Sequence, residues 1–161
     1  MGEVYRAYDN EHCRTVALKR LVTHLADEPE FEKRFRREAF NVARLRSPHV
    51  IPIHRYGEID NQLYIDMRYV DGGDLADLVA AGPLTPARAV TIVEQLAGAL
   101  DEAHAQGLVH RDVKPSNVLL AGAVGDFCYL ADFGITRLES TRRSNSLTRT
   151  GAILGSLAYM A

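Results

Sequence analysis

The sequence predicts an α+β protein in two parts, a small antiparallel sheet with one helix and then a mainly helical part. Three features of the 161 residues indicate this organisation. Two pairs of short runs rich in β-branched and aromatic residues precede position 71, each pair separated by a polar turn. One amphipathic helix lies between the pairs. After two adjacent glycines the pattern becomes helical, so the parts should join near residues 71–74.

In the first part, residues 3–9 and 15–21 predict a hairpin around a polar turn. Residues 29–45 predict a helix, because their apolar side chains recur at a spacing that places them on one face. The members of that face are Phe31, Phe35, Ala39, Val42 and Leu45. Two further strands are expected within residues 49–70, joined by a turn around Asp60–Asn61.

The second part should begin with a short helix through Val79. Thr85 is a suitable N-cap for a long helix over residues 87–107, with Gly107 as its C-cap. The apolar pairs and triplets at 108–109 and 118–120 are interpreted as short buried strands.

Composition excludes several classes of protein. With 47% hydrophobic and 25% charged residues, the chain is typical of globular rather than disordered proteins. The net charge of −2 argues against nucleic acid as the main partner. Cys13 and Cys128 form no CxxC or Cys/His cluster, which predicts reduced thiols in the cytoplasm and no zinc site. No apolar run approaches the roughly 18–20 residues that cross a bilayer, and the N-terminus lacks signal-peptide features.

The stretch LVHRDVKPSNVLL, residues 108–120, places five polar residue types that carry chemistry within one short loop. A charged loop held at both ends by apolar residues is a common position for catalytic groups. The alternative is a solvated turn between two strands.

A lysine–glutamate pair and a set of side-chain oxygens together suggest a site for phosphate and a metal ion. Lys19 ends a predicted strand and can reach a cleft or only extend to solvent. Glu38, on the following helix, could pair with this ammonium group, although such pairs are also common without function. Asp132 and Asn117 offer the hard oxygen ligands that Mg²⁺ takes, which leaves Asp112 to face a hydroxyl.

Four motifs, HRDVKPSN, DFG, VALK and MGEVY, together resemble the signature set of protein kinases in order and spacing. MGEVYRAYD, SPHVIPIHRYGEID and LTRTGAILGSLAYMA are similar to bacterial (actinobacterial), eukaryotic-like serine/threonine kinases. The resemblance implies a two-lobed kinase-like fold, with residues 1–70 as an N-lobe lacking its first strand and 71–161 as the start of the C-lobe through the activation loop. It also implies ATP-dependent phosphorylation of Ser/Thr hydroxyls on proteins in signalling, with ATP and Mg²⁺ or Mn²⁺ as cofactors.

The resemblance implies catalytic roles for four residues. Lys19 would bind the α- and β-phosphates, with Glu38 as its partner. Asp112 would orient the acceptor hydroxyl and take its proton, and Lys114 would steady the γ-phosphate. The implied nucleotide contacts, besides Lys19, are Gly2, Val4, Ala17, Met67 (the gatekeeper), Val70, Asp74 and Leu119.

Other residues would hold the metal or the fold. Asn117 and Asp132 would bind magnesium. His110, Phe133 and Val42 resemble parts of a stacked apolar spine and are interpreted as structural.

Residues 135–161 resemble an activation loop and are rich in hydroxyl groups. Thr148 and Thr150 resemble autophosphorylation sites, and Arg111 could bind the resulting phosphate by charge-assisted hydrogen bonds. The alternative is a surface loop in which Ser and Thr occur by chance.

Two positions depart from the family's usual residues. Ser156 stands where Thr is usual and keeps the hydroxyl, which favours Ser/Thr over Tyr as acceptor. Arg68 follows the gatekeeper, where Glu is usual. Because that position mainly offers its backbone, little effect is expected.

The resemblance further implies that the chain starts inside the glycine-rich loop and stops before the family's remaining helices. The long helix should then expose apolar surface, and the chain alone should fold poorly. Two classes therefore stay open, the core of an active kinase and a catalytically dead nucleotide-binding or interaction fragment. The expected partners are protein substrates and a second copy for autophosphorylation, with any membrane anchor of the parent protein outside this chain.

Overall fold

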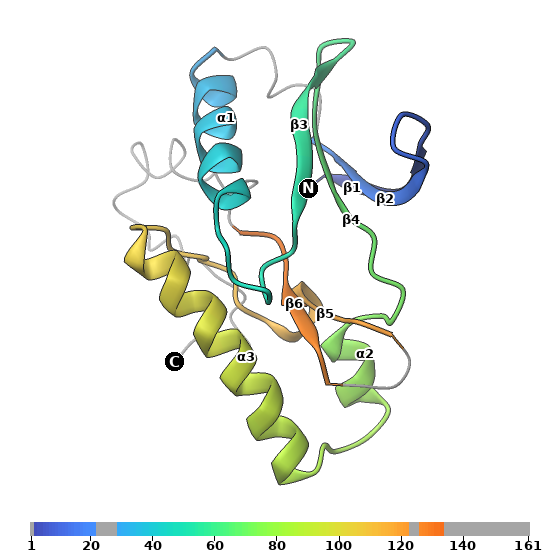
Figure 1. Ribbon diagram of the computed structural model, residues 1–161, viewed down its shortest axis with the longest axis vertical. Helices are drawn as coiled ribbons and strands as arrows, with labels where there is room; N and C mark the ends of the chain where they lie inside the picture. Colours follow the sequence, from blue (N-terminus) through green and yellow to red (C-terminus); the bar gives the residue numbers. More distant parts are fainter. Residues whose placement is uncertain (1, 22–28, 123–125, 134–161) are drawn as a thin grey trace, which may run out of the picture.

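The computed structural model describes residues 2–21, 29–122 and 126–133. A four-stranded antiparallel sheet with one helix is followed by two helices and a two-stranded sheet, in the predicted order (Figure 1). The strands are β1 (Glu3–Asp9), β2 (Arg14–Arg20), β3 (Ile53–Ile59), β4 (Gln62–Arg68), β5 (Val118–Leu120) and β6 (Cys128–Leu130). The helices are α1 (Pro29–Ala43), α2 (Leu75–Ala80), α3 (Pro86–Ala105) and the 3₁₀ turn η2 (Pro115–Asn117).

The larger sheet has the strand order β1-β2-β4-β3, and all its neighbours are antiparallel. The predicted turn between β3 and β4 is confirmed, because Asp60 and Asn61 both have left-handed backbones, with φ of 51° and 58°. The register between β2 and β4 sets Ala17 opposite Met67 and Lys19 opposite Ile65. This pairing brings the expected phosphate-binding lysine onto the same strand pair as the expected gatekeeper.

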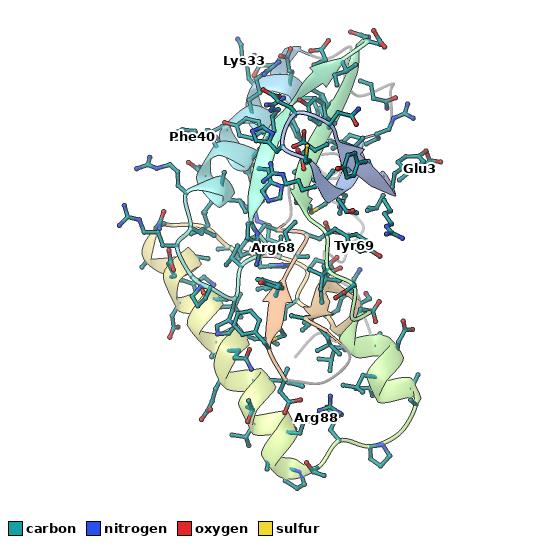
Figure 2. The ribbon with its side chains drawn as sticks, turned by 45° about the vertical axis from the view of Figure 1, so that its right-hand side comes forward. Glu3, Lys33, Phe40, Arg68, Tyr69 and Arg88 are labelled. Atoms are coloured by element: carbon teal, nitrogen blue, oxygen red, sulfur yellow. The ribbon has the colours of Figure 1, made fainter. Side chains whose placement is uncertain are left out.

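Helix α1 buries the face that the sequence predicted. Phe31, Phe35, Ala39 and Val42 are all buried in the main core, and Phe35 meets the ring of Tyr56 on β3 edge-on at 6.5 Å. Phe40 lies on the opposite side of the helix and projects outward (Figure 2). The apolar stripe therefore fixes which side of α1 faces the sheet.

Helix α3 begins as predicted and ends slightly differently. The Thr85 hydroxyl accepts a hydrogen bond from the Arg88 N–H at 3.3 Å, which confirms the N-cap. The expected C-cap, Gly107, is wrong by one position: Gln106 is the C-cap, and Gly107 follows it with φ of 72°. The N–H groups of Gly107 and of the next residue then close the helix on its last carbonyls, as in a Schellman motif.

One expected strand is not formed. Residues 118–120 form β5, which pairs with β6, but Leu108–Val109 is not a strand. The Leu108 N–H donates to the Ala103 carbonyl to close α3, and Val109 is 60% exposed. Closing the helix thus uses the donor that a sheet ladder would need.

Residues 49–52 connect the two parts of the fold beside β6. The Ile51 N–H donates to the Leu130 carbonyl at 3.0 Å, and the Leu130 N–H donates to the His49 carbonyl at 2.7 Å. Figure 1 shows this segment descending from α1 to β6 before the chain returns to β3. The backbone of β6 is therefore attached to the chain that leads into the larger sheet.

The segment between β4 and α2 also approaches the smaller sheet closely. A Cβ atom at Gly72 would lie 2.1 Å from the Leu120 carbonyl oxygen and 2.8 Å from backbone atoms of Gly122. Only glycine fits such an approach without a shift of the backbone.

Helix α3 exposes Val90 and Val93, in keeping with the apolar surface expected from the sequence. In the described part of the chain, no helix has the length and apolar character needed to span a bilayer.

We predict that Phe35→Ala lowers the free energy of unfolding by about 3–5 kcal/mol, because it opens a cavity in a fully buried site. Phe40→Ala is the matched control on the same helix, since Phe40 is 48% exposed, and should cost less than about 1 kcal/mol. Urea unfolding followed by circular dichroism measures both. Equal losses would contradict the assigned orientation of α1.

Candidate active site

An ion pair joins the larger sheet to the segment that follows β6. The Lys19 Nζ lies 2.6 Å from the Asp132 Oδ1, and Lys19 is only 6% exposed. A buried ammonium group requires a counter-charge, and Asp132 supplies it. Asp132 has a left-handed backbone with φ of 61°, which is strained for a residue with a side chain. Two residues that are distant in sequence are thus brought together as expected.

The expected pairing of Lys19 with Glu38 is not present. Within the described residues no ion pair joins them, and the ammonium group engages Asp132. Glu38 lies half-buried on α1. Several carboxylates can compete for one ammonium group, and spacing along the sequence does not rank them.

A second lysine–carboxylate pair lies in the charged loop. The Lys114 Nζ is 3.0 Å from the Asp112 Oδ2. The Asn117 side-chain amide donates to the Asp112 carbonyl at 2.8 Å and to its carboxylate at 3.3 Å. The Asp112 carboxylate is therefore held from two sides by residues that the sequence had placed in the same site.

His110 ties the charged loop to the segment carrying Asp132. Its Nε2 donates to the Ala131 carbonyl at 2.9 Å, and its Nδ1 accepts from the Asp112 N–H at 3.3 Å. The ring lies 4.5 Å from the ring of Phe133 and is 1% exposed. These bonds assign the neutral tautomer with its proton on Nε2.

The expected apolar stack forms around this histidine. Val42 and Phe133 belong to the same buried core, and His110 packs on Phe133. This packing supports the interpretation of the three residues as structural.

The two expected metal ligands are adjacent through the backbone. The Ala131 N–H donates to the Asn117 carbonyl at 2.8 Å, one residue before Asp132. Among the described contacts, the Asn117 side chain makes hydrogen bonds through its Nδ2. Its Oδ1 is therefore the atom suited to binding a cation. A carboxylate and an amide oxygen are the donor types that fit Mg²⁺.

Four of the expected nucleotide contacts share one apolar cluster. Ala17, Met67, Val70 and Leu119 pack together with residues that the sequence had not singled out. These additional members are Ile51, Ala121, Tyr129 and Ala131. Of the features in the sequence, only its position next to Asp132 could have indicated that Ala131 lies near the site.

The remaining expected nucleotide contacts, Val4, Gly2 and Asp74, do not belong to this cluster. Val4 is exposed and pairs with Lys19 across β1 and β2. Gly2 has a backbone reason to be glycine, because a Cβ there would lie 2.3 Å from the Arg20 carbonyl oxygen. Asp74 caps α2 by accepting from the Asp77 N–H at 3.0 Å.

A small cavity lies beside the Lys19–Asp132 pair. Its volume of about 20 Å³ accommodates about one water molecule, so it is not the space that a nucleotide would fill. Its other walls are Val42, Ile51, Ile53, Ile65, Met67 and Phe133.

The expected phosphorylation sites Thr148 and Thr150 lie outside the described residues, as do Ser156 and the rest of the activation loop.

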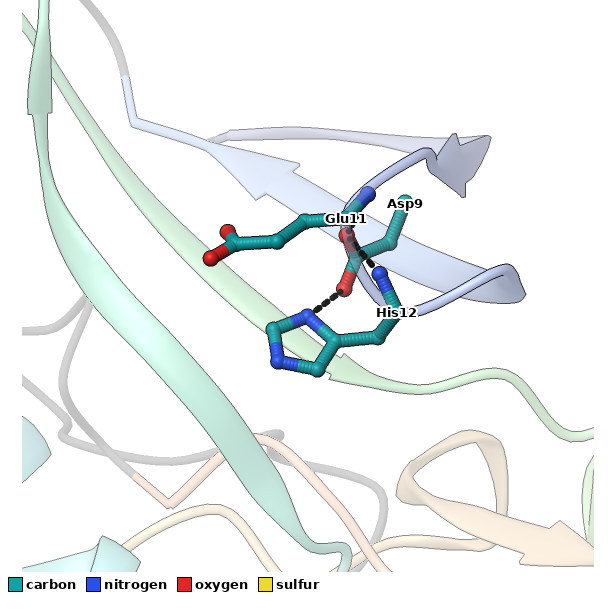
Figure 3. A group of neighbouring side chains, drawn as sticks. All are labelled: Asp9, Glu11 and His12. Atoms are coloured by element: carbon teal, nitrogen blue, oxygen red, sulfur yellow. Dashed lines mark hydrogen bonds and ion pairs between the residues drawn. The ribbon is translucent and has the colours of Figure 1, made fainter.

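A separate polar cluster occupies the tip of the β1–β2 hairpin (Figure 3). His12 Nδ1 lies 2.9 Å from the Asp9 carboxylate, which also pairs with Arg14 at 3.3 Å, and Glu11 pairs with Arg55 at 2.8 Å. Hydrogen bonding to Arg55 lowers the pKa of Glu11. At Asp9 burial opposes ionisation, but the combined interactions with His12 and Arg14 outweigh it and lower the pKa. Both carboxylates are thus engaged with arginines, and the Glu11–Arg55 pair joins the hairpin to β3.

Comparison with known proteins gives a consistent result. The protein kinase domain family matches residues 1–161. The chain is 51% identical to serine/threonine-protein kinase PknE of Mycobacterium bovis and to PknD of Mycobacterium tuberculosis, each over 162 aligned positions. All of this chain is covered in both cases, but only 28% and 24% of those proteins, so it spans about a quarter of their length.

Crystal structures agree with the sequence relatives. The PknI kinase domain of Mycobacterium tuberculosis superposes with a TM-score of 0.72 at 44% identity, covering 84% of this chain and 55% of that one. Rad53 1–466 in complex with AMP-PNP gives 0.74 at 28% identity, covering 83% of this chain and 35% of Rad53. With the family match over every residue and these structural likenesses, the chain belongs to the protein kinase domain family.

Proposed function

We propose that the protein containing this chain transfers the γ-phosphoryl group of ATP to Ser/Thr hydroxyls on proteins. The observation that carries the proposal is the convergence of two lysine–carboxylate pairs from three distant segments, Lys19–Asp132 and Lys114–Asp112. The serine/threonine kinases named above support the acceptor class, and the Rad53 complex with AMP-PNP supports a nucleotide in this fold.

The charges suit phosphoryl transfer. Its transition state is loose and spreads negative charge over the phosphate oxygens, so catalysis depends mainly on positioning and electrostatic stabilisation. Lys19 would bind the α- and β-phosphates, and Lys114 would steady the γ-phosphate. Asp112 would orient the acceptor hydroxyl and accept its proton, since Lys114 and Asn117 already fix its carboxylate.

Asn117 and Asp132 would hold magnesium through their side-chain oxygens. Bound Mg²⁺ would offset phosphate charge. Ala17, Met67, Val70 and Leu119 would enclose the adenine ring as members of one apolar cluster. Gly2 and Val4 would cover the phosphates and the ring, and Asp74 would face the ribose.

The second candidate function is nucleotide binding without transfer. One observation favours it: Lys19 engages Asp132, whereas active kinases hold this lysine with a helix glutamate, here Glu38. Measured transfer decides between the two candidates.

We also propose a cytoplasmic location for the domain and pairing with a second copy for autophosphorylation. Two free cysteines, Cys13 and Cys128, agree with a reducing compartment. A membrane anchor in the parent protein would belong to a segment other than this chain.

In the intact protein, Asp112→Asn should lower kcat for phosphoryl transfer by at least about 100-fold, because the acceptor hydroxyl loses its base. Incorporation of labelled phosphate from ATP into a generic protein substrate measures this. Asp101→Asn, at an exposed position of α3, is the control and should retain wild-type kcat. Equal activity of the two variants would remove Asp112 from the mechanism.

Mg²⁺–ATP should raise the Tm of the wild type by several degrees when present at about 100 times its Kd. Asp132→Asn should lose this increase, since a metal ligand is removed. The ligand-induced increase is the readout because Lys19 also loses its counter-charge in that variant. Asp60→Asn, in the β3–β4 turn, should keep the full increase because Asn tolerates the left-handed backbone. An undiminished increase in Asp132→Asn would contradict the metal assignment.

After incubation with Mg²⁺–ATP, mass spectrometry should find phosphate on Thr148 and Thr150 of the wild type. The Asp112→Asn protein should carry none, because the phosphate is self-transferred. Ser144→Ala serves as a control that keeps both threonines. Absence of phosphate from both threonines in an active wild type would reject them as autophosphorylation sites.

A further inference from the structure

Arg68 and Tyr129 connect the larger sheet to the smaller one by their side chains. Arg68 ends β4, and Tyr129 is the middle residue of β6, 61 positions later. The Arg68 Nη1 donates a hydrogen bond to the Tyr129 hydroxyl, and its Cζ lies 5.6 Å from the centroid of the Tyr129 ring. In Figure 2, Arg68 lies where the larger sheet meets the lower part of the molecule.

Tyr129 depends on this arginine for its hydrogen bond. The residue is 7% exposed and packs in the apolar cluster with Ile51, Met67 and Ala131. A buried phenol that lacks a partner costs free energy, so its hydroxyl needs a donor or acceptor. Arg68 provides the donor while part of its own side chain stays in solvent.

The Tyr129 ring also contacts a second aromatic ring. Phe127 meets it edge-on at 5.1 Å, and His49 packs on Phe127 at 4.6 Å. The His49 Nδ1 donates to the Cys128 carbonyl at 3.0 Å. Arg68 is therefore attached to a ring that has little freedom to move.

The two residues touch each other beside the proposed nucleotide site. Arg68 lies between Met67 and the segment containing Val70, and its N–H donates to the Pro52 carbonyl at 2.9 Å. Tyr129 lies three residues before Asp132, on β6. The pair thus links the strand end that carries adenine contacts to the segment that carries the metal ligand.

We propose that Arg68 and Tyr129 are positioning residues that fix the adenine-contacting end of β4 relative to Asp132. This inference rests on the proposed function. The sequence had led us to expect little effect from the Arg68 side chain, because a backbone role was the only one implied there. The hydrogen bond to a buried hydroxyl gives the side chain a role of its own.

The test is steady-state kinetics of the intact protein with ATP as the varied substrate. Tyr129→Phe removes only the hydroxyl and keeps the ring, and Arg68→Ala removes the donor. Each should raise KM for ATP about five- to tenfold, the size expected for losing the net contribution of a typical intramolecular hydrogen bond. A merely structural role would lower the amount of active enzyme, and so the apparent kcat, at unchanged KM. Arg68→Lys should recover part of the loss.

The double variant should be no worse than either single variant, because both remove the same interaction. Arg44→Ala is the matched control: it breaks an arginine–aromatic contact of 5.2 Å with Phe40, remote from the nucleotide site. Its KM for ATP should equal that of the wild type.

Wild-type KM values in both single variants, or fully multiplicative effects, would overturn the positioning role while leaving the proposed function intact. If the wild type binds ATP without transferring phosphate, the proposed function fails, and the same five- to tenfold change is expected in the Kd for Mg²⁺–ATP. Unchanged Kd values in the two single variants would then overturn the positioning role of Arg68 and Tyr129. A wild type that does not bind ATP would overturn both.

Discussion

The ion pair between the buried Lys19 and the half-buried Asp132 is the constraint on which the two parts of the fold depend. Lys19 is fixed by the pairing of β2 with β4, and Asp132 by the attachment of β6 to residues 49–52. Lys19 is buried, and Asp132 supplies the counter-charge that a buried ammonium group needs. The pair therefore ties the antiparallel sheet to the segment that follows β6.

Around this pair, polar groups are satisfied by the backbone more than by one another. His110 bonds to the main chain at Ala131 and Asp112. The Asn117 side chain bonds to the main chain at Asp112, and its backbone bonds to Lys114 and Ala131. Among the described residues, no fully buried side-chain nitrogen or oxygen lacks a partner. A site built in this way has its side chains oriented before any ligand arrives, which reduces the ordering that binding would require.

The sequence could predict what depends on local pattern. Periodicity identified the buried face of α1, and turn chemistry identified Asp60–Asn61, because both follow from backbone geometry. Motif spacing grouped Asp112, Asn117 and Lys114 correctly within one loop. Choices between competing long-range partners were not predictable, as with the partner of Lys19 or the contact between Arg68 and Tyr129, since nothing local distinguishes them.

The close approach at Gly72 limits how this site can be altered. Even a methyl group there would collide with the Leu120 carbonyl, so no other residue fits at position 72 without a shift of the backbone. Substitutions intended to change which nucleotide or inhibitor binds would have to be made at residues near Gly72 in the sequence. Val70 is the neighbour at which to begin a search for kinases with altered inhibitor selectivity, whereas a replacement at Asp74 has to keep a side-chain acceptor, such as Asn or Ser, that can cap α2.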